Sequence, residues 1–230
     1  MADKSEIIVG QKNVAGASEC HTNASTSARN PLEIALVFAL ILAAVWTPQG
    51  RLNSFFSITA AVCAIWVVLA GRWGPHEMGL TQPMAGAAKI LLTGTALCGV
   101  IGATGFALRS IGPGYPIPLS RSWQYAIWAL VQEFILQSII FIRLESVLGS
   151  RRAMFWVASL YAVAHIPNPV LTALSFFGGL LFCELFRRYR NLFPLGIIHA
   201  ALGLAIAASF PDRWLHHMRV GIGYLSSQHW

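Results

Sequence analysis

The stretch WALVQEFILQSIIFIRLE, residues 128–145, sets the carboxylate of Glu133 and two amides in an apolar run long enough for a membrane helix. Gln137 lies four residues after Glu133, so the two side chains share a helix face. Gln132 lies about 100° round the helix from Glu133. Arg143 follows Gln132 by eleven residues and so returns to nearly the same side of the helix as Gln132. We predict a polar strip, which serves either as a general base or metal ligand or as a hydrogen-bonded link between helices.

The composition of the whole chain agrees with a membrane protein. Of its 230 residues, 56% are hydrophobic and 11% are charged, whereas a soluble domain has about 45–50% apolar and about 25% charged residues. This balance excludes an ordinary soluble enzyme and a disordered chain. The formal net charge of +7 sits mostly in short segments between apolar runs, which is typical of membrane topology signals and not of a nucleic-acid partner.

The apolar runs predict an all-α, polytopic transmembrane helix bundle with about seven to eight membrane segments. A polar tail, expected to be mobile, covers 1–30, the helical domain covers 31–210, and an amphipathic tail at the membrane interface covers 211–230. The expected segments are 31–47, 54–71, 88–108, 123–142, 153–167, 170–186 and 192–210.

The turn Asn168-Pro169 indicates how the fifth and sixth segments are connected. The distribution of basic residues indicates the orientation of the chain in the membrane. Pro167 ends the fifth segment and the turn leads at once into the sixth, so we expect a tight helical hairpin. Lys and Arg are concentrated in the tail and in the loops after the second, fourth and sixth segments. The positive-inside rule therefore predicts a cytoplasmic N-terminus.

Two histidines inside apolar segments join Glu133 as candidates for chemistry. His165 follows Tyr161 by four residues near the end of its helix, where it either acts in a site or caps carbonyl groups. His199 is flanked by Gly196 and Gly203, which would also suit a histidine that only packs between close helices. Three separate segments each contribute one costly ionisable residue, which favours a functional site.

These residues lie in three short motifs: QEFILQ from Gln132, SLYAVAH ending at His165, and FPLGIIHAALG around His199. In order and spacing they resemble the motifs EExxxR, FxxxH and HxxxN of the CPBP family, the CAAX-protease and bacteriocin-processing intramembrane proteases. This family is related to the type II CAAX prenyl endopeptidase. The resemblance covers about residues 120–210 and implies an intramembrane endopeptidase that acts on a membrane-associated protein or peptide.

The resemblance also implies roles for individual residues. Glu133 and His165 would activate a water, and His199, helped by Gln132, would stabilise the oxyanion. Gln137, Tyr161 and Arg143 would support this catalytic set.

Three positions depart from the family pattern. Gln132 replaces the first glutamate, Gln137 replaces the arginine, and Gly203 replaces the asparagine. An amide cannot act as a general base, and a lost oxyanion donor lowers rates by about 10²–10³.

The resemblance implies a glutamic protease without a cofactor in a bacterial inner membrane. Zinc held by Glu133, His165 and His199 is the alternative, because three such ligands leave an open position. Three other functions stay open from the residues. They are a catalytically impaired membrane binding or scaffold protein, a transporter with Glu133 as proton relay, and a haem protein ligated by His165 and His199.

Overall fold

The computed structural model describes residues 30–226 apart from 72, 82–83, 85 and 109–118. Within this part every regular element is a helix, which confirms the all-α prediction. The predicted N-terminal tail lies outside the described residues except for its last residue, Asn30.

Each predicted membrane segment corresponds to a helix in the described part of the chain, but not every helix is long enough to span a bilayer. Five helical stretches are long and apolar enough, whereas Asn30–Val45 and α6 are shorter. The integral membrane class is therefore confirmed, and the count of seven to eight spans is not. The helices are Asn30–Val45, α2 (Arg51–Ala70), α3 (Ala87–Ala107), α4 (Leu119–Glu133), η1 (Phe134–Phe141), α5 (Ile142–Leu148), α6 (Ser150–Val163), α7 (Pro169–Tyr189), α8 (Leu192–Ser209), α9 (Asp212–Leu215), η2 (His216–Met218) and α10 (Gly221–Ser226).

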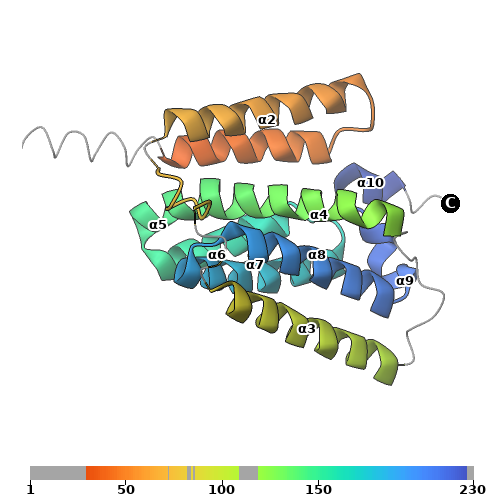
Figure 1. The fold of residues 1–230 in the computed structure, drawn as a ribbon. Coiled ribbons are helices and arrows are strands. Elements are labelled where there is room, and N and C mark those ends of the chain that lie inside the picture. Colours follow the sequence, from red (N-terminus) through yellow and green to blue (C-terminus); the bar gives the residue numbers. More distant parts are fainter. Residues whose placement is uncertain (1–29, 72, 82–83, 85, 109–118, 227–230) are drawn as a thin grey trace, which may run out of the picture.

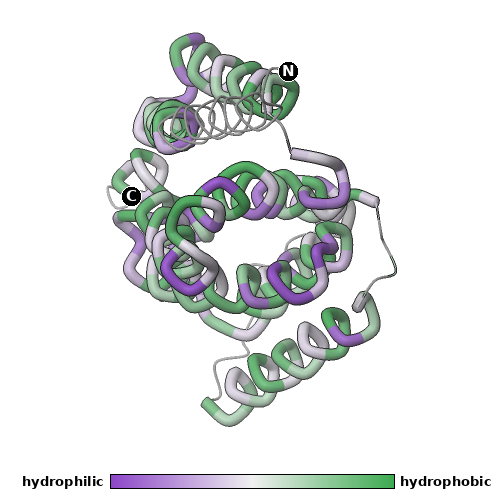
Figure 2. The backbone as a smooth tube through the Cα atoms, turned by 90° about the vertical axis from the view of Figure 1, so that its left-hand side faces the viewer, coloured by the Kyte–Doolittle hydropathy of each residue, from purple (hydrophilic) through white to green (hydrophobic). Residues whose placement is uncertain are grey.

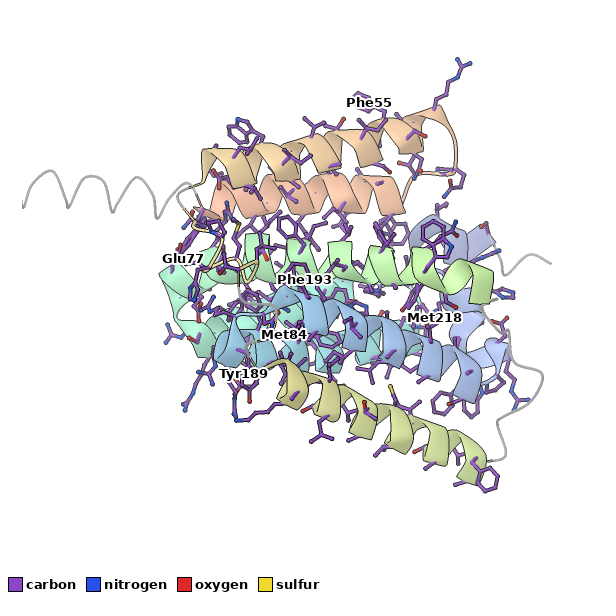
Figure 3. All side chains as sticks on the ribbon, in the orientation of Figure 1. Phe55, Glu77, Met84, Tyr189, Phe193 and Met218 are labelled. Carbon is purple, nitrogen blue, oxygen red and sulfur yellow. The ribbon has the colours of Figure 1, made fainter. Side chains whose placement is uncertain are left out.

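The helices from α4 to α8 form the centre of the molecule, as Figures 1 and 2 show. The hairpin of Asn30–Val45 and α2 lies on one side, and α3 lies on the opposite side against α8. Phe55 projects from the outer face of α2 (Figure 3) and is 60% exposed, and Ile58, Val62 and Leu69 on the same helix are similarly exposed. Such an apolar outer surface suits contact with lipid.

Small residues let the central helices approach closely. A Cβ atom at Gly196 of α8 would lie 2.7 Å from the Leu130 side chain and 3.1 Å from the Leu130 Cα atom of α4. At Gly179 of α7, a Cβ would lie 3.0 Å from the Ala158 Cα atom of α6. These contacts are the small-residue packing that is usual between membrane helices.

The predicted hairpin between α6 and α7 is confirmed, and Asn168 organises its turn. The Asn168 side chain caps α7 by accepting a hydrogen bond from the Leu171 N–H at 3.1 Å, and Pro169 is the first residue of the helix. The Asn168 amide also donates to the carbonyl oxygens of Leu215 and Arg219. The stretch after α8 is therefore folded onto this turn.

A π-helical segment, η1, interrupts the fourth predicted helix and explains where Arg143 points. The π-helix forms i→i+5 bonds and has wider turns than the α-helix assumed for the sequence. Arg143 therefore does not return to the face of Gln132. Its Nε atom donates to Glu33 at 3.1 Å and its Nη2 atom to the carbonyl oxygen of Val67 at 2.9 Å. The structure corrects the prediction that Arg143 extends the polar strip, since it anchors the N-terminal hairpin instead.

The close contact at Gly196 gives a first prediction. Gly196→Ala should lower stability by about 1–3 kcal/mol, because the added methyl group meets the Leu130 backbone and cannot be accommodated without a shift. Gly102→Ala on α3 is the matched control, since nothing lies within 4 Å of its added Cβ. The apparent melting temperature of the purified chain in detergent measures both. Equal melting temperatures would contradict the close-packing argument.

The buried pair of Arg143 and Glu33 gives a second prediction. The two side chains are 1% and 7% exposed, so Arg143→Met should remove a buried charge partner of Glu33 and cost up to about 3–5 kcal/mol. The double variant Arg143→Met/Glu33→Met removes both charges and should melt at a higher temperature than either single variant. Additive losses in the double variant would mean that the pair is not coupled.

Candidate active site

A cavity of about 530 Å³ lies among the helices of the bundle. Its wall is mostly apolar, which is typical of ligand sites that carry a few oriented polar groups. Met218, labelled in Figure 3, belongs to this wall and comes from the stretch after α8. The polar side chains that line the cavity are Tyr125, Gln132, Tyr161, His165, Ser175 and His199.

Glu133 is fully buried at the end of α4, and both of its carboxylate oxygens accept hydrogen bonds. The Nε2 atom of Gln137 donates to Oε2 at 3.1 Å. The Nδ1 atom of His199 lies 2.8 Å from Oε1. The sequence placed Glu133 and Gln137 on one face, and the structure adds His199 from α8 to the same cluster.

His199 continues this chain of hydrogen bonds to Tyr161 on α6. With Glu133 ionised, Nδ1 of His199 must carry the proton that it shares with the carboxylate, because a carboxylate only accepts. In the neutral ring, Nε2 then accepts a hydrogen bond from the Tyr161 hydroxyl at 3.1 Å. Phe182 stacks on the imidazole at 5.1 Å between ring centroids and holds its plane. Three helices thus meet in the chain Glu133, His199, Tyr161.

His165 has a defined tautomer at the end of α6. Its Nδ1 atom lies 2.7 Å from the carbonyl oxygen of Tyr161, and a carbonyl oxygen only accepts hydrogen bonds. Nδ1 therefore carries the proton, and in the neutral ring Nε2 keeps its lone pair. The Tyr161 and His165 rings also meet edge to face at 4.7 Å. Since His165 lines the cavity, a basic nitrogen is available to this site.

Gln132 and Glu133 are adjacent in sequence but lie differently with respect to the cavity. Gln132 lines it, whereas Glu133 is not among the residues of its wall and lies behind Tyr161 and His199 in the hydrogen-bonded chain. Glu133 is 0% exposed. Among the described residues that form the wall, the basic groups are the two histidines, and none is a carboxylate.

The residues proposed as zinc ligands do not fit a metal in this arrangement. Across the described residues, no group of three or more His, Cys, Asp or Glu side chains is gathered closely enough to hold a metal ion. Both ring nitrogens of His199 face Glu133 and Tyr161, and Nδ1 of His165 faces a backbone oxygen.

Tyr125 is a cavity residue that the motifs did not identify. It lies on α4 seven residues before Gln132, which is close to two helical turns, so both side chains reach the same cavity. This spacing was the available signal in the sequence. It was missed because the motifs begin at Gln132 and because aromatic side chains near helix ends are common at membrane interfaces.

Comparison with known proteins agrees with the resemblance seen in the motifs. The family model described as Rce1-like, type II CAAX prenyl endopeptidase Rce1-like, matches residues 119–205. No curated protein and no solved structure matches the chain. The matched segment holds Glu133, His165 and His199 together with Gln132 and Tyr125. Residues 119–205 are thus similar to the Rce1-like family of type II CAAX prenyl endopeptidases, in agreement with the three motifs.

Proposed function

We propose that the chain is an intramembrane endopeptidase that hydrolyses a peptide bond in a membrane-associated protein. The observation that carries the proposal is the hydrogen-bonded cluster of Glu133, His199 and Tyr161, which lies with His165 beside an apolar cavity. Ionisable side chains are costly in a bilayer and mark functional sites there. The family match over residues 119–205 supports the same chemistry.

In the proposed reaction, His165 is the general base that activates a water in the cavity. Its Nε2 lone pair is free for this role because Nδ1–H donates to the Tyr161 carbonyl oxygen. Nε2 takes a proton from the water while the water oxygen bonds to the substrate carbonyl carbon. The peptide C–N bond then breaks, and the proton on His165 passes to the leaving nitrogen.

The oxyanion that forms in this step is stabilised by donors on the cavity wall. In the neutral His199 ring, Nδ1–H donates to Glu133 and Nε2 accepts from the Tyr161 hydroxyl, and this hydroxyl turns away from Nε2 as the oxyanion forms. The Tyr161 O–H is then released to donate to the oxyanion, and the Gln132 amide supplies a second donor. Preoriented donors in a site of low dielectric constant stabilise developing charge strongly.

The motifs suggest a more direct role for Glu133, as the base that deprotonates the water with help from His165. That role requires the carboxylate to release Gln137 or His199 and to enter the cavity. Because Glu133 is fully buried and accepts hydrogen bonds at both oxygens, we propose that it acts through His199.

The proposed location is the inner membrane of a bacterium, with the N-terminus in the cytoplasm. The end of α7 supports this orientation. Arg187 donates to Glu184 at 2.8 Å, Arg188 pairs with the same carboxylate, and Arg190 pairs with Glu145. Basic residues clustered at one end of a membrane helix are typical of the cytoplasmic side.

A second function, binding of a membrane protein without hydrolysis, is favoured by one observation. Among the described residues of the cavity wall there is no carboxylate, and Gln132 stands where the family motif has glutamate. This function predicts that the wild-type chain cleaves nothing, whereas Gln132→Glu, which adds an acid to the cavity, produces cleavage. Cleavage by the wild-type chain would overturn it.

The endopeptidase proposal predicts that defined protein termini in the cell depend on this site. Cells with the wild-type chain should contain new termini in membrane or secreted proteins, and His165→Ala should reduce them by about 10²–10⁴. Terminal-peptide mass spectrometry measures them at equal amounts of the chain in membranes. The matched control is His76→Ala, which changes an exposed histidine outside the cavity. Identical termini in wild-type and His165→Ala cells would overturn the proposal.

The indirect role of Glu133 predicts a specific pattern in a double-mutant cycle. If Glu133 acts through His199, Glu133→Gln and His199→Ala should each slow cleavage, and the double variant should be little slower than the slower single variant. If Glu133 is the direct base, the two losses should multiply. Cleavage is measured per amount of folded chain, since both residues are buried.

A further inference from the structure

The hydroxyl of Tyr125 occupies a place in the cavity that a neighbouring glycine keeps open. A Cβ atom at Gly203 would lie 1.9 Å from the Tyr125 hydroxyl oxygen and 2.7 Å from Cζ of the same ring. Such distances are far too short for a side chain at position 203. The tyrosine hydroxyl therefore lies directly on the backbone of α8, and only glycine at that position allows it.

This contact brings the hydroxyl close to the rest of the site. Gly203 follows His199 by four residues, so both lie on the same face of α8. All three residues, together with Gln132, line the same cavity. The hydroxyl thus lies against Gly203, one helical turn after His199, on the cavity wall that Gln132 also lines.

The Tyr125 hydroxyl is available to a ligand. No hydrogen-bond partner is found for it among the described residues, whereas the Tyr161 hydroxyl is bonded to His199. Most of the side chains that line the same cavity, Ile101, Leu202 and Ile206 among them, are apolar and cannot accept a hydrogen bond. A hydroxyl in apolar surroundings is unfavourable until it is paired, so a carbonyl oxygen that enters the cavity is a suitable acceptor.

We propose that the Tyr125 hydroxyl donates a hydrogen bond to the scissile carbonyl oxygen of the substrate and to the oxyanion that this oxygen becomes. Tyr125 is then a catalytic residue, and Gly203 is a positioning residue that makes room for it. The inference rests on the proposed endopeptidase function. It assigns an oxyanion donor from α4 that the three motifs do not contain.

The test uses the full chain reconstituted in liposomes and a synthetic peptide that spans a cleavage site mapped by terminal-peptide mass spectrometry. Tyr125→Phe removes only the hydroxyl, so kcat should fall by about 10²–10³ with little change in KM. Tyr189→Phe is the matched control, because Tyr189 lies at the end of α7 and does not line the cavity. Melting temperatures of both variants should equal that of the wild type.

A rescue experiment separates a hydrogen-bond donor from a structural role. Tyr125→Ala empties the space next to Gly203 and should lose activity. Adding Gly203→Asn should restore part of kcat, because its amide refills the space with a donor, whereas adding Gly203→Leu should not. A wild-type kcat in Tyr125→Phe, or equal rescue by Asn and Leu, overturns the inference while the endopeptidase function stands. A wild-type chain that cleaves nothing overturns both.

Discussion

The hydrogen bond of 2.8 Å between Nδ1 of His199 and Oε1 of Glu133 is the contact on which the site depends. It joins α4 to α8 inside the bundle and pairs two ionisable groups that would each be costly alone in a bilayer. Gly196, one turn before His199, allows this approach because α8 packs there against the Leu130 backbone. Packing and chemistry are therefore coupled, since the bond forms only where the two helices come this close.

The π-helical segment that follows Glu133 decides which polar groups can join this pair. Gln137, four residues after Glu133, donates to the carboxylate at 3.1 Å. The wider turns of the Phe134–Phe141 segment turn Arg143 away from the site toward Glu33 and the N-terminal hairpin. The cation is thereby removed from the site and used to hold a peripheral helix. π-helical turns inside longer helices are often found at functional sites, and here the segment separates the Arg143–Glu33 ion pair from the hydrogen-bonded cluster of Glu133 and His199.

The pattern of apolar residues and the free-energy cost of ionisable groups in a bilayer predict much of this structure. They fail where contacts between helices decide the direction of a side chain. Apolar runs predicted the helices, and the Asn168-Pro169 turn predicted the α6–α7 hairpin. The cost of burying ionisable groups identified Glu133 and His199, which the structure brings together. Arg143 was placed wrongly because its azimuth was counted at 3.6 residues per turn across a π-helical segment. The short Asn30–Val45 and α6 helices show that apolar runs do not decide how many segments cross the membrane.

The contacts of Gln137 and Gly203 explain two of the positions that differ from the family motifs. An amide at Gln137 still donates to Glu133, so the carboxylate keeps a partner without a cation. The absence of a side chain at Gly203 is matched by the Tyr125 ring, which fills that space from another helix. A motif residue is thus only one partner of a contact. The effect of changing it depends on the residue that it contacts on another helix. For this reason the departures do not by themselves argue for a lost activity, because a donor remains at both places, Gln137 on Glu133 and Tyr125 on the cavity wall.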